Sequence, residues 1–238
     1  MKKLVILSGD GMSAERGIST FRDAGGLWDK YPVEQVATPE GYARNPELVI
    51  NFYNERRKQL LDVVPNAGHL GVADLERDFN VTVVTQNVDN LHERAGSTHV
   101  IHLHGELTKV CSSRDPYNPH FVKELAPEEY EVKLGDKAGD GTQLRPFIVW
   151  FGESVPEIET AIRYVEQADI FVIIGTSLNV YPAAGLLNYV PRAAEVYLID
   201  PKPVDTHVMR PIHVIQKGAS EGVKELKALL AATQPPLL

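Results

Sequence analysis

Leu4-Val5-Ile6-Leu7-Ser8-Gly9-Asp10-Gly11-Met12-Ser13-Ala14 is the stretch of sequence that decides the fold. It begins with a short apolar run, which is typical of a strand buried on both faces. The residues from Gly9 to Ala14 then fit the pattern G-x-G-x-x-G/A, where such a strand passes into a helix. Glycines there let the backbone approach a pyrophosphate, and a helix N-terminus favours its charge. The stretch predicts a dinucleotide site, with a plain tight turn as the alternative.

Short apolar runs and longer segments of helical periodicity alternate along the rest of the chain. This alternation is typical of βαβ units and predicts an α/β fold with a doubly wound, mostly parallel, Rossmann-like sheet in a single domain, 1–238. Strands are expected at Leu4–Ser8, Val81–Thr85, Val100–Leu103, Phe147–Trp150, Ile170–Ile174, Val196–Ile199 and His213–Ile215, and helices at Pro46–Val63, Asn66–Asp78, Pro156–Gln167, Pro182–Val190 and Ser220–Ala231.

Two connections are too long for simple crossovers and predict a small second module. The first, at about 23–63, is expected to form a helical insertion and part of a lid over a cofactor. The second, at about 106–144, is rich in charge, proline and glycine, and is expected to form a weakly cored module. The Rossmann-like core then takes about 1–22, 64–105 and 145–238.

Composition excludes several classes of protein. The chain has 24 Lys and Arg against 32 Asp and Glu, a net charge of −8, which gives no support for binding nucleic acid through a basic surface. Its apolar runs are too short to span a membrane, and the N-terminus lacks the features of a signal peptide, so we expect a cytoplasmic protein. The single cysteine, Cys111, excludes an internal disulfide and a multi-cysteine zinc site.

Polar residues follow several of the expected strands, at the edge where open α/β sheets bind ligands. Thr85–His92 gathers amide and acid groups, and a polar loop with Asx caps is the alternative. His104 ends the next strand and is a candidate general base. His99 and His102 are better interpreted as packed or surface histidines. Asp200 ends a later strand, where its carboxylate could accept hydrogen bonds from ribose hydroxyls.

Tyr53 and Arg56 are three residues apart on the long expected helix and so share one face. A guanidinium beside a phenol could bind a substrate carboxylate in bidentate fashion. The alternative, taken from the pair alone, is an ordinary solvated helix face.

Taken in order, the motifs resemble the sirtuin family of NAD-dependent protein lysine deacylases. The matching blocks cover nearly the whole chain except 111–143; they are Gly9–Asp23, Pro65–His69, Thr85–His92, His104–Glu106, Val149–Glu153 and Gly175–Ala184. The resemblance implies that NAD is consumed as a co-substrate, that nicotinamide is displaced, and that the acyl group passes to ADP-ribose. The implied partners are acylated lysine side chains of proteins, with no nucleic acid and no membrane.

The resemblance also implies residue roles. His104 is the implied general base, Asn87 positions the ribose, and Phe21 shields the reactive carbon from water. The peptide is expected to add as a strand between two segments, 151–153 and 179–181. The implied cofactor contacts are Gly9, Asp10, Gly11, Phe21, Arg22, Gln86, Asn87, Asp89, Gly175, Thr176, Ser177, Asp200 and Ala219, and the implied substrate contacts are Tyr53, Arg56, Val149, Phe151, Gly152 and Val180.

Tyr53 and Arg56 match the subclass that removes acidic acyl groups, which implies that succinyl and malonyl are preferred and acetyl is also removed. Cys111 alone remains of the family's usual zinc-binding cysteines, so a zinc-free remnant and no metal are expected. Asp10 replaces the family's alanine, and Asp200 its usual asparagine. Two other hypotheses stay open: a non-catalytic module that binds NAD or ADP-ribose, motivated by Asp10, and a hydride-transfer oxidoreductase, motivated by the glycine turn.

Overall fold

The computed structural model describes residues 1–16 and 30–233. A parallel sheet forms the centre of its larger lobe. Its six strands lie in the order β3-β2-β1-β7-β8-β9. They are β1 (Lys3–Ser8), β2 (Asn80–Thr85), β3 (Val100–His102), β7 (Ile170–Ile174), β8 (Glu195–Ile199) and β9 (His213–Ile215). β1 pairs with both β2 and β7, so the strand order reverses there. The predicted doubly wound α/β fold is confirmed, with its topological switch point at the ends of β1 and β7.

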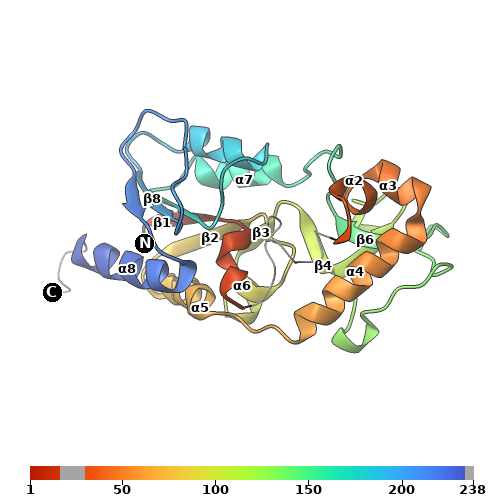
Figure 1. Cartoon of the computed structure of the whole chain (residues 1–238). Coiled ribbons are helices and arrows are strands. Elements are labelled where there is room, and N and C mark those ends of the chain that lie inside the picture. Colours follow the sequence, from red (N-terminus) through yellow and green to blue (C-terminus); the bar gives the residue numbers. More distant parts are fainter. Residues whose placement is uncertain (17–29, 234–238) are drawn as a thin grey trace.

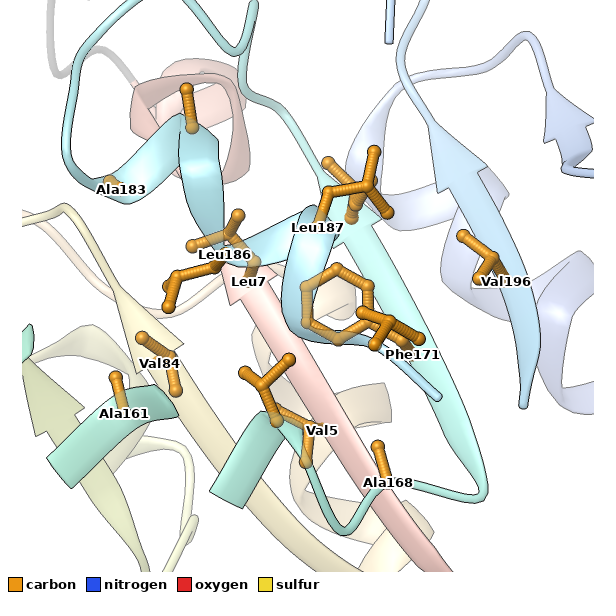
Figure 2. Close-up of a cluster of buried hydrophobic side chains, with 14 of the residues drawn as sticks. Val5, Leu7, Val84, Ala161, Ala168, Phe171, Ala183, Leu186, Leu187 and Val196 are labelled. Atoms are coloured by element: carbon orange, nitrogen blue, oxygen red, sulfur yellow. The ribbon is translucent and has the colours of Figure 1, made fainter. Parts of the chain in front are cut away.

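Helical segments cover both faces of this sheet, which explains why its strands are almost wholly apolar. α5 (Ala67–Asp74) and α8 (Ala219–Thr233) lie on one face, and α7 (Ile158–Val165) lies on the other with the 3-10 segment η6 (Ala183–Tyr189) (Figure 1). Val5, Leu7 and Phe171 pack toward η6, as Figure 2 shows. Leu4 and Ile6, the alternate residues of β1, join the core under α5 and α8.

A smaller lobe is built from the two insertions. Its antiparallel sheet has the order β5-β4-β6, formed by β4 (Gly105–Ser112), β5 (Lys123–Glu124) and β6 (Leu144–Ile148). The helices α2 (Val33–Val36), α3 (Pro39–Arg44) and α4 (Pro46–Leu61) complete the lobe (Figure 1). The remaining elements are α6 (Leu91–Arg94) and the 3-10 turns η1 (Asp10–Met12), η2 (Ala14–Arg16), η3 (Leu75–Arg77), η4 (Pro119–Phe121) and η5 (Pro127–Glu129).

Two expectations about this arrangement are wrong. The run Phe147–Trp150 is not a strand of the parallel sheet, because residues 144–148 form β6 and pair with β4. An apolar run does not reveal which sheet it joins. The expected boundary at 145 therefore falls within β6. Pro182–Val190 forms the 3-10 segment η6 rather than an α-helix. The second insertion contributes Leu107, Val110 and Val132 to apolar clusters that it shares with α4.

Partly buried hydrogen bonds hold the outer part of the small lobe together. The Ser112 hydroxyl donates to Asp140 at 2.6 Å and accepts from the backbone N–H of Arg114 and Asp115. Thr142 donates to the other oxygen of Asp140, also at 2.6 Å. These bonds tie the end of β4 to the loop that carries Asp140 and Thr142.

Arg57 joins α4 to the rest of this lobe. Its guanidinium donates to Tyr130 O at 2.8 Å and to Asn54 Oδ1 at 2.7 Å. Asn54 in turn pairs with the backbone of Val132, donating at 2.7 Å and accepting at 2.9 Å. The Arg57 side chain is buried, so its charge is stabilised by these acceptors rather than by water.

We expect Arg57→Met to lower the free energy of unfolding by roughly 2–4 kcal/mol, because it leaves Tyr130 O without its donor and removes one of the two donors to Asn54 Oδ1. Urea denaturation of the two proteins measures the change. The exposed neighbour Lys58 is the control, and Lys58→Met should stay within about 0.5 kcal/mol. Equal effects of the two substitutions would contradict a structural role for Arg57.

No helix within residues 1–16 and 30–233 has both the length and the apolar character needed to cross a membrane.

Candidate functional site

One cavity of about 640 Å³ lies where the carboxyl ends of the parallel strands meet the small lobe. Turns after β1, β2, β7 and β8 supply one wall, and α4 with the segment after β6 supplies another. This is the switch point of the sheet, where open α/β folds bind ligands. Its volume is in the range of small-molecule and cofactor sites.

Gly9, Gly11 and Gly175 bring two strand ends into backbone contact at the cavity. A Cβ on Gly9 would lie 2.6 Å from Gly175 O, and a Cβ on Gly11 would lie 2.8 Å from Gly175 Cα. Gly175 itself has φ +63°, a conformation that other residues rarely adopt. The chain then passes into the short 3-10 turns η1 and η2, so the expected α-helix does not begin directly after this turn. The glycines thus have a packing role besides leaving room for a ligand.

The polar loop after β2 is fixed by hydrogen bonds to neighbouring strand ends. The Gln86 amide donates to Thr176 Oγ1 at 3.0 Å, and the Asn87 amide donates to Gly9 O at 2.8 Å. Asp89 Oδ1 accepts the backbone N–H of Leu91 at 3.0 Å. All these side chains except that of Leu91 line the cavity. The loop is therefore held in one arrangement against β1 and β7.

His104 lies in the cavity wall just after β3, and its hydrogen-bond partner determines which tautomer it adopts. Nδ1 is 3.2 Å from Gln86 O. Because a carbonyl oxygen can only accept, Nδ1 carries the hydrogen and Nε2 keeps the lone pair. Burial lowers the pKa of His104 below its ordinary value. His104 is therefore a neutral imidazole with a basic Nε2 near pH 7.

A chain of buried hydrogen bonds reaches Asp89 from the far side of the loop. The Asn66 backbone N–H donates to His69 Nδ1 at 3.1 Å, which leaves the hydrogen on Nε2, 3.4 Å from Ser13 Oγ. Ser13 Oγ donates to Asp89 Oδ2 at 3.0 Å. Burial lowers the pKa of His69. Sequence reasoning missed Ser13 and His69 as members of the site, although both lie in blocks that matched a family pattern.

On α4, the side chains of Tyr53 and Arg56 lie in a different place from that of Arg57. Tyr53 and Arg56 line the cavity, whereas Arg57 is buried in the small lobe. The Arg56 guanidinium lies 5.9 Å from the Phe52 ring centroid. Burial lowers the pKa of Arg56, but a guanidinium stays charged in proteins. The alternative of a solvated helix face does not hold for Tyr53, of which 1% is exposed.

Arg145, Trp150 and Glu153 form a second group that sequence reasoning did not single out. Arg145 donates to both oxygens of Glu153, at 3.0 and 2.9 Å. Its guanidinium also stacks 3.7 Å from the Trp150 ring centroid. Trp150 and Glu153 line the cavity.

The structure brings most of the sequence-predicted site residues together. Phe21 and Arg22 lie outside the described residues. Ala219 is buried at the start of α8 and is not part of the cavity wall, whereas the preceding Gly218 is. His102 bonds to Glu93 at 2.5 Å, and His99 to Thr82 at 3.0 Å, so neither contributes to the cavity. The predicted residues in its wall are Gly9, Asp10, Gly11, Tyr53, Arg56, Gln86, Asn87, Asp89, His104, Val149, Phe151, Gly152, Gly175, Thr176, Ser177, Val180 and Asp200.

Comparison with known proteins identifies the family. The model of the Sir2 family matches residues 9–182. The chain belongs to the Sir2 family. It is 84% identical to an NAD-dependent protein deacylase of Bacteroides thetaiotaomicron over 230 residues, 97% of this chain and 98% of that protein. It is 50% identical to an NAD-dependent protein deacylase of Helicobacter pylori over 226 residues, 95% of this chain and 96% of that protein.

Solved Sir2 structures share this fold over nearly its whole length. A Sir2 homologue in complex with NAD has a TM-score of 0.84 at 38% identity, covering 98% of this chain and 91% of that one. A mutant Sir2 homologue in complex with ADP-ribose has a TM-score of 0.85 at 35% identity, covering 98% and 95%. The resemblance drawn from the sequence motifs is thus confirmed at the level of the family.

The cavity of this Sir2 family member fits a dinucleotide. Gly9 and Gly11 present backbone without side chains at the strand ends, and amides and carboxylates surround them. Asp200 accepts the Lys202 backbone N–H at 2.8 Å, and burial raises the pKa of its carboxyl. Ribose hydroxyls are donors that suit such a carboxylate. Asp10 is exposed at the cavity rim, so its charge remains in contact with solvent.

The residues do not fit a thiolate zinc site. Cys111 is fully buried, its thiol faces Pro146 O at 3.7 Å, and burial raises its pKa to about 12. Zinc binds the thiolate, which is disfavoured here. Among residues 1–16 and 30–233, no group of three His, Cys, Asp or Glu side chains could hold a metal ion.

Proposed function

We propose that this protein removes succinyl and malonyl groups, in preference to acetyl, from lysine side chains of cytoplasmic proteins. Its general activity is NAD-dependent protein deacylation, as the names of its Sir2 family relatives state. NAD is the co-substrate, and the products are nicotinamide and O-acyl-ADP-ribose. The observation that carries the acyl preference is the position of Tyr53 and Arg56 in the wall of the cavity that holds His104.

The residues around the strand ends have different roles in the reaction. When bound, NAD supplies the ribose carbon from which nicotinamide leaves. Nε2 of His104 accepts the proton of a ribose hydroxyl, because its Nδ1 is already committed to Gln86 O. Asn87 is held by Gly9 O, so it presents a fixed surface to the ribose. Preorganised groups of this kind need no rearrangement during the reaction.

Arg56 supplies the acyl preference. Its guanidinium can bind the two oxygens of a succinyl or malonyl carboxylate through parallel N–H donors. An acetyl group has no carboxylate and gains nothing from this contact. Half-burial of Arg56 keeps the pair from full screening by water, which strengthens it.

The peptide is proposed to lie between two backbone segments, 151–153 and 179–181. Phe151, Gly152 and Val180 line the cavity, and Phe151 and Tyr181 are 47% and 68% exposed. Backbone pairing with an extended peptide tolerates many side chains, so we expect many protein substrates.

A panel assay tests this proposal. The purified protein is incubated with NAD and matched succinyl-, malonyl- and acetyl-lysine peptides, while nicotinamide and peptide mass are followed. We expect the highest kcat/KM on the acidic acyl groups. A higher kcat/KM on acetyl-lysine would overturn the acyl preference alone, whereas no acyl loss from any peptide, with NAD bound, would overturn the deacylase activity.

The pH dependence should follow the pKa of His104. The lowered pKa places the midpoint of imidazole protonation below its ordinary value of about 6.5. We expect kcat/KM to fall at acid pH with a midpoint below 6.5. A pH–rate profile whose acid limb has its midpoint above 6.5 would contradict the base assigned here.

The proposed enzyme works without zinc. We expect metal analysis of the purified protein to find well under one zinc per chain, and deacylation to persist after dialysis against a chelator. A zinc-dependent sirtuin treated in the same way is the control. Stoichiometric zinc that is lost together with folding would show that the interpretation of Cys111 and residues 111–143 is wrong.

A further inference from the structure

We infer that Trp150 is a positioning residue for acyl recognition, because its indole N–H fixes the direction in which the Tyr53 hydroxyl donates. The inference rests on the proposed preference for acidic acyl groups. It adds an uncharged residue that acts on the acyl carboxylate through Tyr53.

The hydrogen bond between these two side chains has only one possible direction. Trp150 Nε1 lies 3.1 Å from the Tyr53 hydroxyl oxygen, and the two residues are 97 positions apart in sequence. An indole N–H can only donate, so the Tyr53 oxygen is the acceptor. Among the described residues, no hydrogen bond uses the Tyr53 hydroxyl as donor. Tyr53 lines the cavity, so a bound carboxylate is a suitable acceptor for its proton.

Trp150 is itself held in one orientation. The Arg145 guanidinium stacks on its ring, with 3.7 Å from Cζ to the centroid, and Glu153 binds Arg145 in bidentate fashion. Glu153 Oε1 also accepts the Trp150 backbone N–H at 2.8 Å. Only 2% of Trp150 is exposed. An ion pair, a stacked ring and a backbone bond therefore fix the indole before any substrate arrives.

The consequence concerns acidic acyl groups in particular. Burial raises the pKa of Tyr53, so its hydroxyl keeps its proton at neutral pH and remains a donor. With the lone pair engaged by Trp150, rotation of the hydroxyl is restricted and its proton points away from the indole. A hydroxyl donor that is already oriented loses less conformational entropy when it binds a carboxylate. Acetyl-lysine offers no carboxylate to receive this proton, so the contribution appears in the acyl selectivity.

Trp150→Phe tests the inference, because phenylalanine keeps an aromatic ring under Arg145 but removes the N–H. We expect the ratio of kcat/KM on succinyl-lysine to kcat/KM on acetyl-lysine to fall about 3- to 10-fold, mainly through KM for the succinyl peptide. Tyr53→Phe should lower the ratio as well. In the double variant, Trp150→Phe should add nothing, because the hydroxyl that it orients is already absent.

Tyr42→Phe is a matched packing control. The Tyr42 ring lies 5.3 Å from that of Trp150, and its hydroxyl bonds to Ser113 rather than to Tyr53. We expect this variant to keep the succinyl-to-acetyl ratio of the wild type. A fall in the ratio equal to that of Trp150→Phe would overturn the inference, because packing alone would then explain both.

The outcomes separate this inference from the proposed function. A wild type that prefers succinyl-lysine, with an unchanged ratio in Trp150→Phe or with additive effects in the double variant, overturns the inference and leaves the proposed function standing. A wild type that removes only acetyl groups overturns both.

A spectroscopic measurement covers the case in which Trp150→Phe does not fold. The chain has two tryptophans, and Trp28→Phe assigns the indole ¹⁵N–¹H signals. Loss of the hydrogen bond in Tyr53→Phe should move the Trp150 proton signal upfield. An unmoved signal would overturn the inference.

Discussion

Deacylation should fall by about 10²- to 10⁴-fold in His104→Ala, the range typical for loss of a general base, while NAD still binds. The cause is local: His104 Nε2 is the basic nitrogen in the cavity, and its orientation depends on the bond from Nδ1 to Gln86 O. Alanine leaves the neighbouring glycine turns and the loop after β2 in place. Nicotinamide release and peptide mass measure the reaction, and calorimetry measures NAD binding.

His120→Ala is the control for this experiment, because His120 is exposed and does not line the cavity. It should react at the wild-type rate. Turnover in His104→Ala close to that of the wild type would exclude His104 as the base. If the wild type binds NAD but transforms no peptide, the chain is instead the non-catalytic NAD or ADP-ribose module that Asp10 suggested. An absorbance rise from reduced nicotinamide would revive the hydride-transfer hypothesis, and we expect none.

The parallel sheet could be predicted from sequence because its central strands β1, β7 and β8 share one local pattern. A strand covered on both faces needs apolar residues at successive positions, as in Leu4, Val5, Ile6 and Leu7. In the small lobe, the apolar run Phe147–Trp150 overlaps the end of β6, which pairs with β4. Pairing partners lie far away in sequence, so the local pattern cannot distinguish the two sheets.

Much of the site was predictable for a geometric reason. The carboxyl ends of parallel strands meet at one edge, so polar residues just after β1, β2, β3, β7 and β8 converge on one cavity. His104 and Asp200 were found in this way. Hydrogen bonds between residues far apart in sequence have no such local pattern. Ser13 and Asp89 are 76 residues apart, and Tyr53 and Trp150 are 97 residues apart. Only the family resemblance assigned Tyr53 and Arg56 to an acyl site.

Arg56→Met should lower the ratio of kcat/KM on succinyl-lysine to kcat/KM on acetyl-lysine by roughly 10- to 100-fold. A hydrogen bond to a charged group is worth about 1.5–3 kcal/mol, and each 1.4 kcal/mol is a factor of ten. Methionine keeps an unbranched apolar stem along Phe52 but removes the guanidinium that we propose binds the carboxylate. Competition between the two peptides in one reaction measures the ratio directly.

Two other positive residues of α4, Arg57 and Lys58, could serve as controls for Arg56→Met, but only one of them is suitable. Arg57→Met changes the same charge one position away, but Arg57 holds Tyr130 and Asn54, so its effects combine folding with catalysis. Lys58→Met removes a positive charge from the exposed face of α4 and should leave the ratio unchanged. A ratio that Arg56→Met also leaves unchanged would mean that the cavity wall formed by α4 does not select the acyl group, and that the enzyme discriminates among lysine acylations elsewhere.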